Sequence, residues 1–166
     1  CSFVYSNAQK GKGRPGGEKR NDDLCWIFEV EDTESGLAAG SVVHLKSKAH
    51  GDEGYLQSDS EADVSWGAKN ADTAWVLEFP PGLYSGQFVH LQSIANGQFW
   101  RGNFEGNGEE GFCWDAEKSR LSAWLVEIDN ASTTKIEKGC CIHLRSLNRV
   151  LHGEEAYLQN TAEEGE

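Results

Sequence analysis

The sequence has few prolines, few basic residues and no long apolar run. Its 166 residues include 3 Pro against 19 Gly, and 38% of them are hydrophobic, so neither a collagen-like nor a disordered chain is expected. No apolar run approaches the roughly 18 residues of a membrane-spanning helix, and no charged-then-apolar leader opens the chain. We therefore expect residues 1–166 to form a single soluble domain, without membrane insertion.

Basic residues are outnumbered by acidic ones. The chain carries 27 Asp and Glu against 15 Lys and Arg, a net charge of −12, which repels polyanions and argues against a nucleic-acid partner. Five of the basic residues lie within residues 10–20, opposed there only by Glu18, so this Gly-rich stretch carries +4 (five minus one). We interpret residues 10–23, approximately, as a basic insertion loop, with a dedicated anion site as the alternative.

The cysteines show no CxxC pair and no zinc-type spacing with histidine, so no metal or other cofactor is expected. They are Cys1, Cys25, Cys113, Cys140 and Cys141. Their odd number leaves at least one unpaired or shared with another chain. The triplet Asn130-Ala131-Ser132 is a glycosylation sequon, which favours the extracellular space or the lumen of the secretory pathway.

Three short blocks each occur three times along the chain. Tryptophan opens the first block, which reads WIFEV at 26–30, WVLEF at 75–79 and WLVEI at 124–128. The second reads VHLKS at 43–47, VHLQS at 89–93 and IHLRS at 142–146, each followed by a turn and a short apolar stretch at 55–56, 99–100 and 150–151. The third lies at 3–10, 64–69 and 112–118. Recurrence of three blocks indicates an internal threefold repeat.

Each block alternates with period two, the pattern of half-buried strands. Trp75, Leu77 and Phe79 share one face, and Glu78 lies on the other. In the second block a histidine, at 44, 90 or 143, lies opposite the buried Val and Leu, so the three histidines are expected to splay outward and to bind no metal. No segment sustains a 3.6-residue period, so the class is all-β.

Counting the blocks gives twelve strands, in three pseudo-repeats of four, with the chain starting at the third strand of one repeat. This arrangement resembles the β-trefoil, a six-stranded barrel capped by three hairpins, and it predicts that the two termini lie side by side. The sequence VSWGAKNADTAWVLEF at 64–79 is most similar to the MIR domains of protein O-mannosyltransferases and inositol trisphosphate receptors. The His-Ser-His signature of those domains is absent at 56–59, 100–103 and 151–154, and so is the ricin-type Gln-x-Trp. The resemblance therefore implies the fold and leaves the ligand open.

Residues present in all three repeats are explained by packing. The tryptophans at 26, 75 and 124 are therefore expected in the core, and Tyr5, Trp66 and Trp114 as core or cap aromatics, with sugar-stacking platforms as the alternative.

Trp100 departs from the repeat, because it takes the place of Leu56 and Leu151. It is either a local enlargement of the core or an exposed ring on which a sugar could stack, held by neighbouring polar side chains. The candidate binding residues are Asn96, Trp100, Arg101 and Asn103, with Asp52 and Glu154 at the equivalent turns.

No catalytic arrangement emerges from the sequence. Acidic clusters at 59–63 and 105–110 lie in Gly- and Ser-rich segments typical of solvated turns, and Cys113 has no evident orienting partners. We predict a non-enzymatic, lectin-like module that binds a glycan or glycoprotein. The alternative is a protein-interaction or structural subunit that docks through its acidic surface or basic loop, and a protease-inhibitor or cytokine-like trefoil is a third option.

Overall fold

The computed structural model describes residues 12–16, 25–31, 36–59, 64–104, 110–128, 135–147 and 157–161, without the side chains of 12–16, 103–104, 110–112 and 157–161. The elements in this part are twelve strands and three single-turn 3-10 helices. The strands are β1 (Lys12–Gly16), β2 (Trp26–Val30), β3 (Ser41–Ser47), β4 (Tyr55–Ser58), β5 (Val64–Gly67), β6 (Ala74–Glu78), β7 (Gln87–Ser93), β8 (Phe99–Phe104), β9 (Glu110–Asp115), β10 (Ala123–Ile128), β11 (Cys141–Ser146) and β12 (Tyr157–Thr161). The 3-10 helices are η2 (Gly51–Glu53), η3 (Ala71–Thr73) and η4 (Arg120–Ser122). None of the helices among the described residues is long and apolar enough to cross a membrane.

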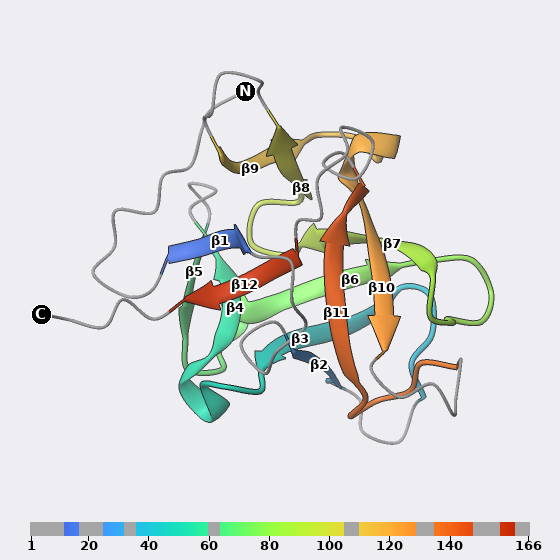
Figure 1. Cartoon of the computed structure of the whole chain (residues 1–166), viewed down its shortest axis with the longest axis horizontal. Helices are drawn as coiled ribbons and strands as arrows, with labels where there is room; N and C mark the ends of the chain where they lie inside the picture. The colour runs from blue at the N-terminus through green and yellow to red at the C-terminus, as the bar shows by residue number, and fades with distance from the viewer. Residues whose placement is uncertain are drawn as a thin grey trace, which may run out of the picture.

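Six strands close into an antiparallel barrel (Figure 1). Going round it, β2 pairs with β3, β3 with β6, β6 with β7, β7 with β10, β10 with β11, and β11 again with β2. All six come from the two blocks that alternate most regularly in sequence, the tryptophan-led block and the VHL block. The predicted all-β class is confirmed.

The other six strands form three antiparallel pairs, one attached to every second barrel strand. In each attachment a residue near the end of the barrel strand pairs with the first residue of the added strand: Lys46 with Tyr55, Gln92 with Phe99, and Arg145 with Tyr157. The added pairs are β4 with β5, β8 with β9, and β12 with β1. This arrangement is compatible with a β-trefoil.

The last of these pairs corrects two sequence predictions. The second strand of the closing repeat is β12 at 157–161, so the residue equivalent to Leu56 and Trp100 is Leu158, and Leu151 lies outside the described residues. Residues 12–16, expected in the insertion loop, instead form β1 and pair along their whole length with β12. β1 lies at the edge of the sheet, where Pro15, which has no backbone N–H to donate, can be accommodated. The block predicted at 3–10, with Tyr5, and both chain termini lie outside the described residues.

The core contains the repeated tryptophans, as predicted. Trp26, Trp75 and Trp124 are at most 2% exposed. The indole N–H of Trp75 donates a hydrogen bond to the Leu56 carbonyl oxygen, and that of Trp124 donates to the Trp100 carbonyl oxygen. Trp66 stacks on Trp26 and Trp114 stacks on Trp75, with ring centroids 5.0 and 6.0 Å apart. Trp66 is buried and Trp114 is partly buried against the core, so the prediction of core or cap aromatics is confirmed for both.

A disulfide joins the two strands that close the barrel. Cys25, directly before β2, is bonded to Cys141, the first residue of β11, across 116 residues of sequence. The β2–β11 pairing comprises two residue pairs, against four or five between the other neighbouring barrel strands. Cys113 and Cys140 are free thiols. The disulfide therefore reinforces the shortest seam of the barrel.

Candidate functional site

The structure places Trp100 in the core rather than on the surface. The ring has 0% exposure and stacks on Trp124, with centroids 4.6 Å apart, while Trp75 lies 5.7 Å away on another side. A ring enclosed by two other indoles has no face left for a sugar. The expectation of a sugar platform at Trp100 is corrected, and its alternative, an enlarged core, is what the structure shows.

Two polar neighbours of Trp100 are engaged within the protein. The Asn96 side chain donates to Ser58 Oγ over 2.9 Å and accepts from the Gln98 backbone N–H over 2.9 Å, so it fixes the turn after β7. Arg101 forms an ion pair with Asp115 of the neighbouring strand, with 3.4 Å between Nη1 and the carboxylate. Both side chains have structural partners here, so neither is held ready for a ligand.

The remaining predicted residues do not gather at one place. Asp52 lies in η2 with its carboxylate exposed and 2.6 Å from Lys46 Nζ. The hydrogen bond from Lys46 holds the pKa of Asp52 below its usual value and raises that of the lysine. Asn103 lies on β8, but its side chain, like the whole of Glu154, lies outside what the structure describes, so a role for these two residues stays a prediction.

A repeated arrangement surrounds the histidines of the VHL strands. In each repeat the histidine pairs across the sheet with the glutamate of the preceding tryptophan strand: Glu29 with His44, Glu78 with His90, and Glu127 with His143. The histidines do not splay into solvent as predicted, because His44 and His143 are buried and His90 is half-buried. The predicted exposure was wrong, because other parts of the chain cover the outer face of the barrel at these strands.

The hydroxyls in the helix caps determine which ring nitrogen of His44 and His90 carries the proton. Asn70 and Ser119 cap η3 and η4 through reciprocal capping boxes with Thr73 and Ser122. The Ser122 hydroxyl gives its single proton to the Ser119 carbonyl, so His90 Nδ1, 3.2 Å away, must donate to it.

Thr73 likewise gives its proton to the Asn70 carbonyl and accepts from His44 Nδ1 at 2.7 Å. Neutral His44 and His90 are therefore Nδ1–H tautomers, and their Nε2 atoms are acceptors.

Around His44 the outer face is closed by a charge network. The carboxylate of Glu29 accepts a hydrogen bond from the Tyr55 hydroxyl at 2.9 Å and lies 3.4 Å from Lys69 and 3.6 Å from Lys46. Burial raises the pKa of Tyr55, and its hydrogen bond to the glutamate raises it further. Every charge in this cluster is matched within the protein.

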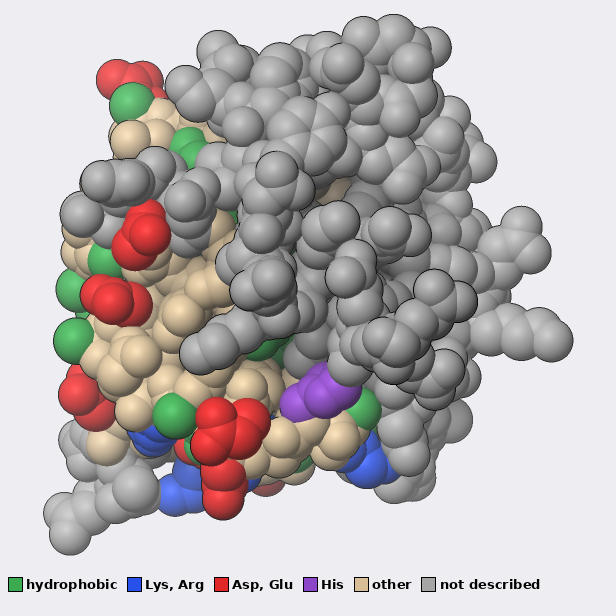
Figure 2. All heavy atoms as spheres, turned by 90° about the vertical axis from the view of Figure 1, so that its left-hand side faces the viewer, with side chains coloured by type: hydrophobic (Ala, Val, Ile, Leu, Met, Phe, Trp, Pro, Cys, Tyr) green, Lys and Arg blue, Asp and Glu red, His purple; other side chains and the backbone are tan. Residues whose placement is uncertain are grey.

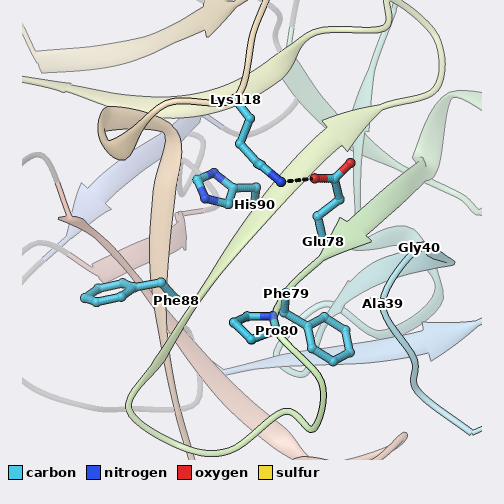
Figure 3. Close-up of a pocket in the computed structure, with 8 residues that line it drawn as sticks. All are labelled: Ala39, Gly40, Glu78, Phe79, Pro80, Phe88, His90 and Lys118. Carbon is cyan, nitrogen blue, oxygen red and sulfur yellow. Dashed lines mark hydrogen bonds and ion pairs between the residues drawn. The ribbon is translucent and has the colours of Figure 1, made fainter.

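Around His90 the equivalent face is open. Phe99 and Gln92 occupy the positions that Tyr55 and Lys46 have in the first repeat. Among the described residues Glu78 therefore has one charged partner, Lys118, at 2.7 Å. A pocket of about 560 Å³ lies here. Figure 3 shows its polar wall, with the Lys118 ammonium between His90 and the Glu78 carboxylate, and the rings of Phe79, Pro80 and Phe88 on another side. Ala39 and Gly40, in the turn before β3, complete the lining.

Phe88 supplies the exposed ring of this pocket. Its side chain is 43% exposed, and it occupies the position of Val42 in the first repeat, since Val42 pairs with Val76 and Phe88 with Leu125 in equivalent registers. Phe88 was not among the residues predicted from the sequence. The signal that could have revealed it is the same departure from threefold symmetry that drew attention to Trp100.

The charges of the pocket cancel. Burial lowers the pKa of His90, and the Lys118 ammonium lowers it further, so the imidazole is neutral at pH 7. Glu78 and Lys118 neutralise each other. On the face shown in Figure 2, the described acidic side chains are scattered and basic ones lie beside some of them. Among the described residues no group of three or more His, Cys, Asp or Glu side chains is arranged to hold a metal.

Comparison with known proteins gives similarity at the level of the fold. No protein-family model and no curated protein sequence matches the chain. Among solved structures, an SDF2-like protein from Arabidopsis thaliana aligns with a TM-score of 0.51 and 14% identity, over 75% of this chain and 82% of that one. The protein O-mannosyltransferase complex Pmt1–Pmt2 from S. cerevisiae, bound to its sugar donor, aligns with a TM-score of 0.49 and 13% identity, over 98% of this chain but 25% of that one.

Proposed function

We propose that this chain is a non-catalytic, carbohydrate-binding module with a β-trefoil fold, distantly related to MIR domains. The closed six-stranded barrel with three attached strand pairs supports the trefoil assignment. The fold similarity to the SDF2-like protein is compatible with a distant MIR-like relation. The disulfide between Cys25 and Cys141 supports a location in an oxidising compartment, the extracellular space or the secretory lumen.

One observation carries the carbohydrate assignment: the pocket beside His90 combines an exposed aromatic ring with three polar groups. Sugar sites in proteins pair an aromatic ring, which contacts the apolar C–H face of a pyranose, with donors and acceptors for its hydroxyls. Phe88 supplies the ring, and Glu78, His90 and Lys118 supply the polar groups. The pocket volume of about 560 Å³ lies within the range of small-molecule sites.

A glycan array probed with the whole chain tests this function. We expect binding to a defined group of glycans and its loss in Phe88→Val, which installs the residue that the first repeat has at this position. The matched control is Ile94→Val, because Ile94 is also an exposed apolar side chain but lies outside the pocket lining. Absence of binding to any glycan would reject the proposal in favour of a protein-interaction subunit.

A further inference from the structure

We infer that the pocket beside His90 selects neutral sugar residues and discriminates against acidic ones. This inference rests on the proposed carbohydrate-binding function and names the ligand class of the same site. It depends on which hydrogen-bonding atoms the pocket presents to a ligand.

The pocket presents two hydrogen-bond acceptors without partners among the described residues. His90 Nδ1 donates to Ser122, so Nε2 has no proton in the neutral ring and carries a lone pair. Glu78 binds Lys118 through Oε2, at 2.7 Å, and its Oε1 has no described partner. Two acceptors placed on one wall require donors from the ligand, and sugar hydroxyl groups provide them.

Lys118, the one cation among the described lining residues, is already compensated. Lys118 Nζ can donate three hydrogen bonds, of which Glu78 takes one, so it can still donate to a ligand hydroxyl. Its charge, however, is matched by the Glu78 carboxylate. A carboxylate or sulfate on the ligand would have to compete with Glu78 for Lys118, while facing the lone pairs of Oε1 and Nε2. An anionic sugar is therefore disfavoured by the pocket, and the net charge of −12 disfavours it further.

The apolar side of the pocket sets the orientation. Phe79, Pro80 and Phe88 lie on the side away from Lys118 (Figure 3). A pyranose that places its C–H face on the exposed ring of Phe88 turns its hydroxyl edge toward the wall with two acceptors and one ammonium.

The experiment compares neutral and acidic glycans of matched length at about pH 7.5, by calorimetry with the whole chain. The neutral probes are methyl glycosides and trisaccharides of mannose, galactose, glucose and N-acetylglucosamine, and the acidic probes carry sialic or glucuronic acid. We expect measurable binding to neutral probes only. Phe88→Val should weaken it by about tenfold, and His90→Asn, which keeps the donor to Ser122 but removes Nε2, should weaken it by a smaller factor.

Glu78→Gln gives the sharpest test, because it leaves the Lys118 charge uncompensated. This variant should bind acidic probes more tightly than the parent does and lose part of its affinity for neutral ones. All variants are first checked for unchanged melting midpoints. Should a pocket variant fail to fold, Ala39→Leu, which adds bulk to the lining outside the polar wall, replaces it and should also weaken binding.

The outcomes separate the two proposals. Preference for acidic probes that depends on Phe88 would overturn the inference and leave the carbohydrate-binding function intact. Binding of neutral probes that is indifferent to Phe88, His90 and Glu78 would also overturn it and move the search to the turns near Asp52 and Glu154. Absence of binding to every probe would reject the function itself.

Discussion

Two equivalent regions of the barrel surface, around His44 and around His90, have the same scaffold and opposite surface chemistry. In both, a histidine donates through Nδ1 to a hydroxyl fixed by a capping box and faces a glutamate on the adjacent strand. In the part of the chain that the structure describes, the glutamate near His44 has three partners, whereas the one near His90 has one and borders a pocket.

The difference comes from a few substitutions between the repeats. Tyr55 becomes Phe99, Lys46 becomes Gln92, and Val42 becomes Phe88. The first two changes remove a hydroxyl and an ammonium from the neighbourhood of the glutamate, and the third adds an exposed ring. The two regions thus share the same backbone arrangement, and substitutions at three positions distinguish a closed charge network from an open pocket.

The largest expected loss of stability comes from a substitution in the core beneath the barrel strands. Trp100→Ala should lower the free energy of unfolding by about 3–5 kcal/mol, because it removes a fully buried indole from between Trp75 and Trp124. Trp100→Leu, which installs the residue found at position 56, should cost less than the alanine variant. Denaturant melts measure both. A loss below about 1 kcal/mol for the alanine variant would mean that Trp100 is not part of the packed core.

The second effect concerns the β2–β11 seam, whose strand β2 also carries Glu29 of the His44 region. Replacing Cys25 by Ala, the residue at positions 74 and 123, together with Cys141→Val should cost about 2–4 kcal/mol, because the disulfide closes a loop across 116 residues. Reduction of the parent protein should reproduce the loss and leave the variant unaffected. Equal melting midpoints of oxidised parent and variant would show that the β2–β11 pairing holds without its cross-link.

Much of this frame could be predicted from the sequence, because barrel strands bury one face and therefore alternate. The tryptophan-led and VHL blocks gave the six barrel strands to within two residues. The closing strands were harder, since β1 consists of Lys, Gly, Arg and Pro and shows no apolar alternation at all. The better guide to β12 was the recurrence of Tyr-Leu-Gln at 55–57 and 157–159.

The candidate site could be predicted less well, because it depends on which parts of the chain cover which strand. Trp100 and Phe88 both replace an aliphatic residue of the first repeat, yet one ring is enclosed by other indoles and the other stays exposed. Position along a strand gives the face of a residue but not what packs over it. For the histidines, the capping pattern Asn70-x-x-Thr73 was the available signal that a hydroxyl would cover the ring.

Exchanging the substitutions tests the comparison directly. The double variant Gln92→Lys/Phe99→Tyr should give Glu78 the partners that Glu29 has, occupy its free Oε1, and weaken binding of a neutral glycan by about tenfold without loss of stability. Calorimetry and thermal melts measure the two properties. The reverse exchange, Lys46→Gln/Tyr55→Phe, should create no glycan site, because Val42 supplies no ring there; a new site in that variant would show that the ring is dispensable.

A smaller effect appears on acidification. Burial lowers the pKa of both His44 and His90 from 6.5, with Lys69 and Lys118 respectively adding to the shift; Glu29 and Glu31 oppose it at His44, and Glu78 at His90. The unfolded chain therefore binds these protons at higher pH than the folded one. Their stabilising contribution is complete above about pH 6.5 and is lost as the pH falls through the lowered values.

Melting midpoints between about pH 7.5 and 5.5 should consequently fall in the parent protein. The fall should be smaller in the double variant His44→Asn/His90→Asn, whose amides keep a donor toward Thr73 and Ser122 but do not titrate. His50→Asn is the matched control, since His50 lies outside both arrangements. An unchanged slope in the double variant would mean that other groups govern the acid sensitivity.

The smallest expected effect compares the two glutamates themselves. Glu29→Ala removes the acceptor of the Tyr55 hydroxyl and the partner of two lysines, so it should lower the free energy of unfolding by about 1 kcal/mol. Glu78→Ala removes one half-exposed ion pair and should stay within about 0.5 kcal/mol. Denaturant melts with matched slopes resolve this difference. Equal losses of unfolding free energy in the two variants would mean that the three contacts of Glu29 stabilise the fold no more than one surface ion pair does. The charge network around His44 would then close the surface without adding stability.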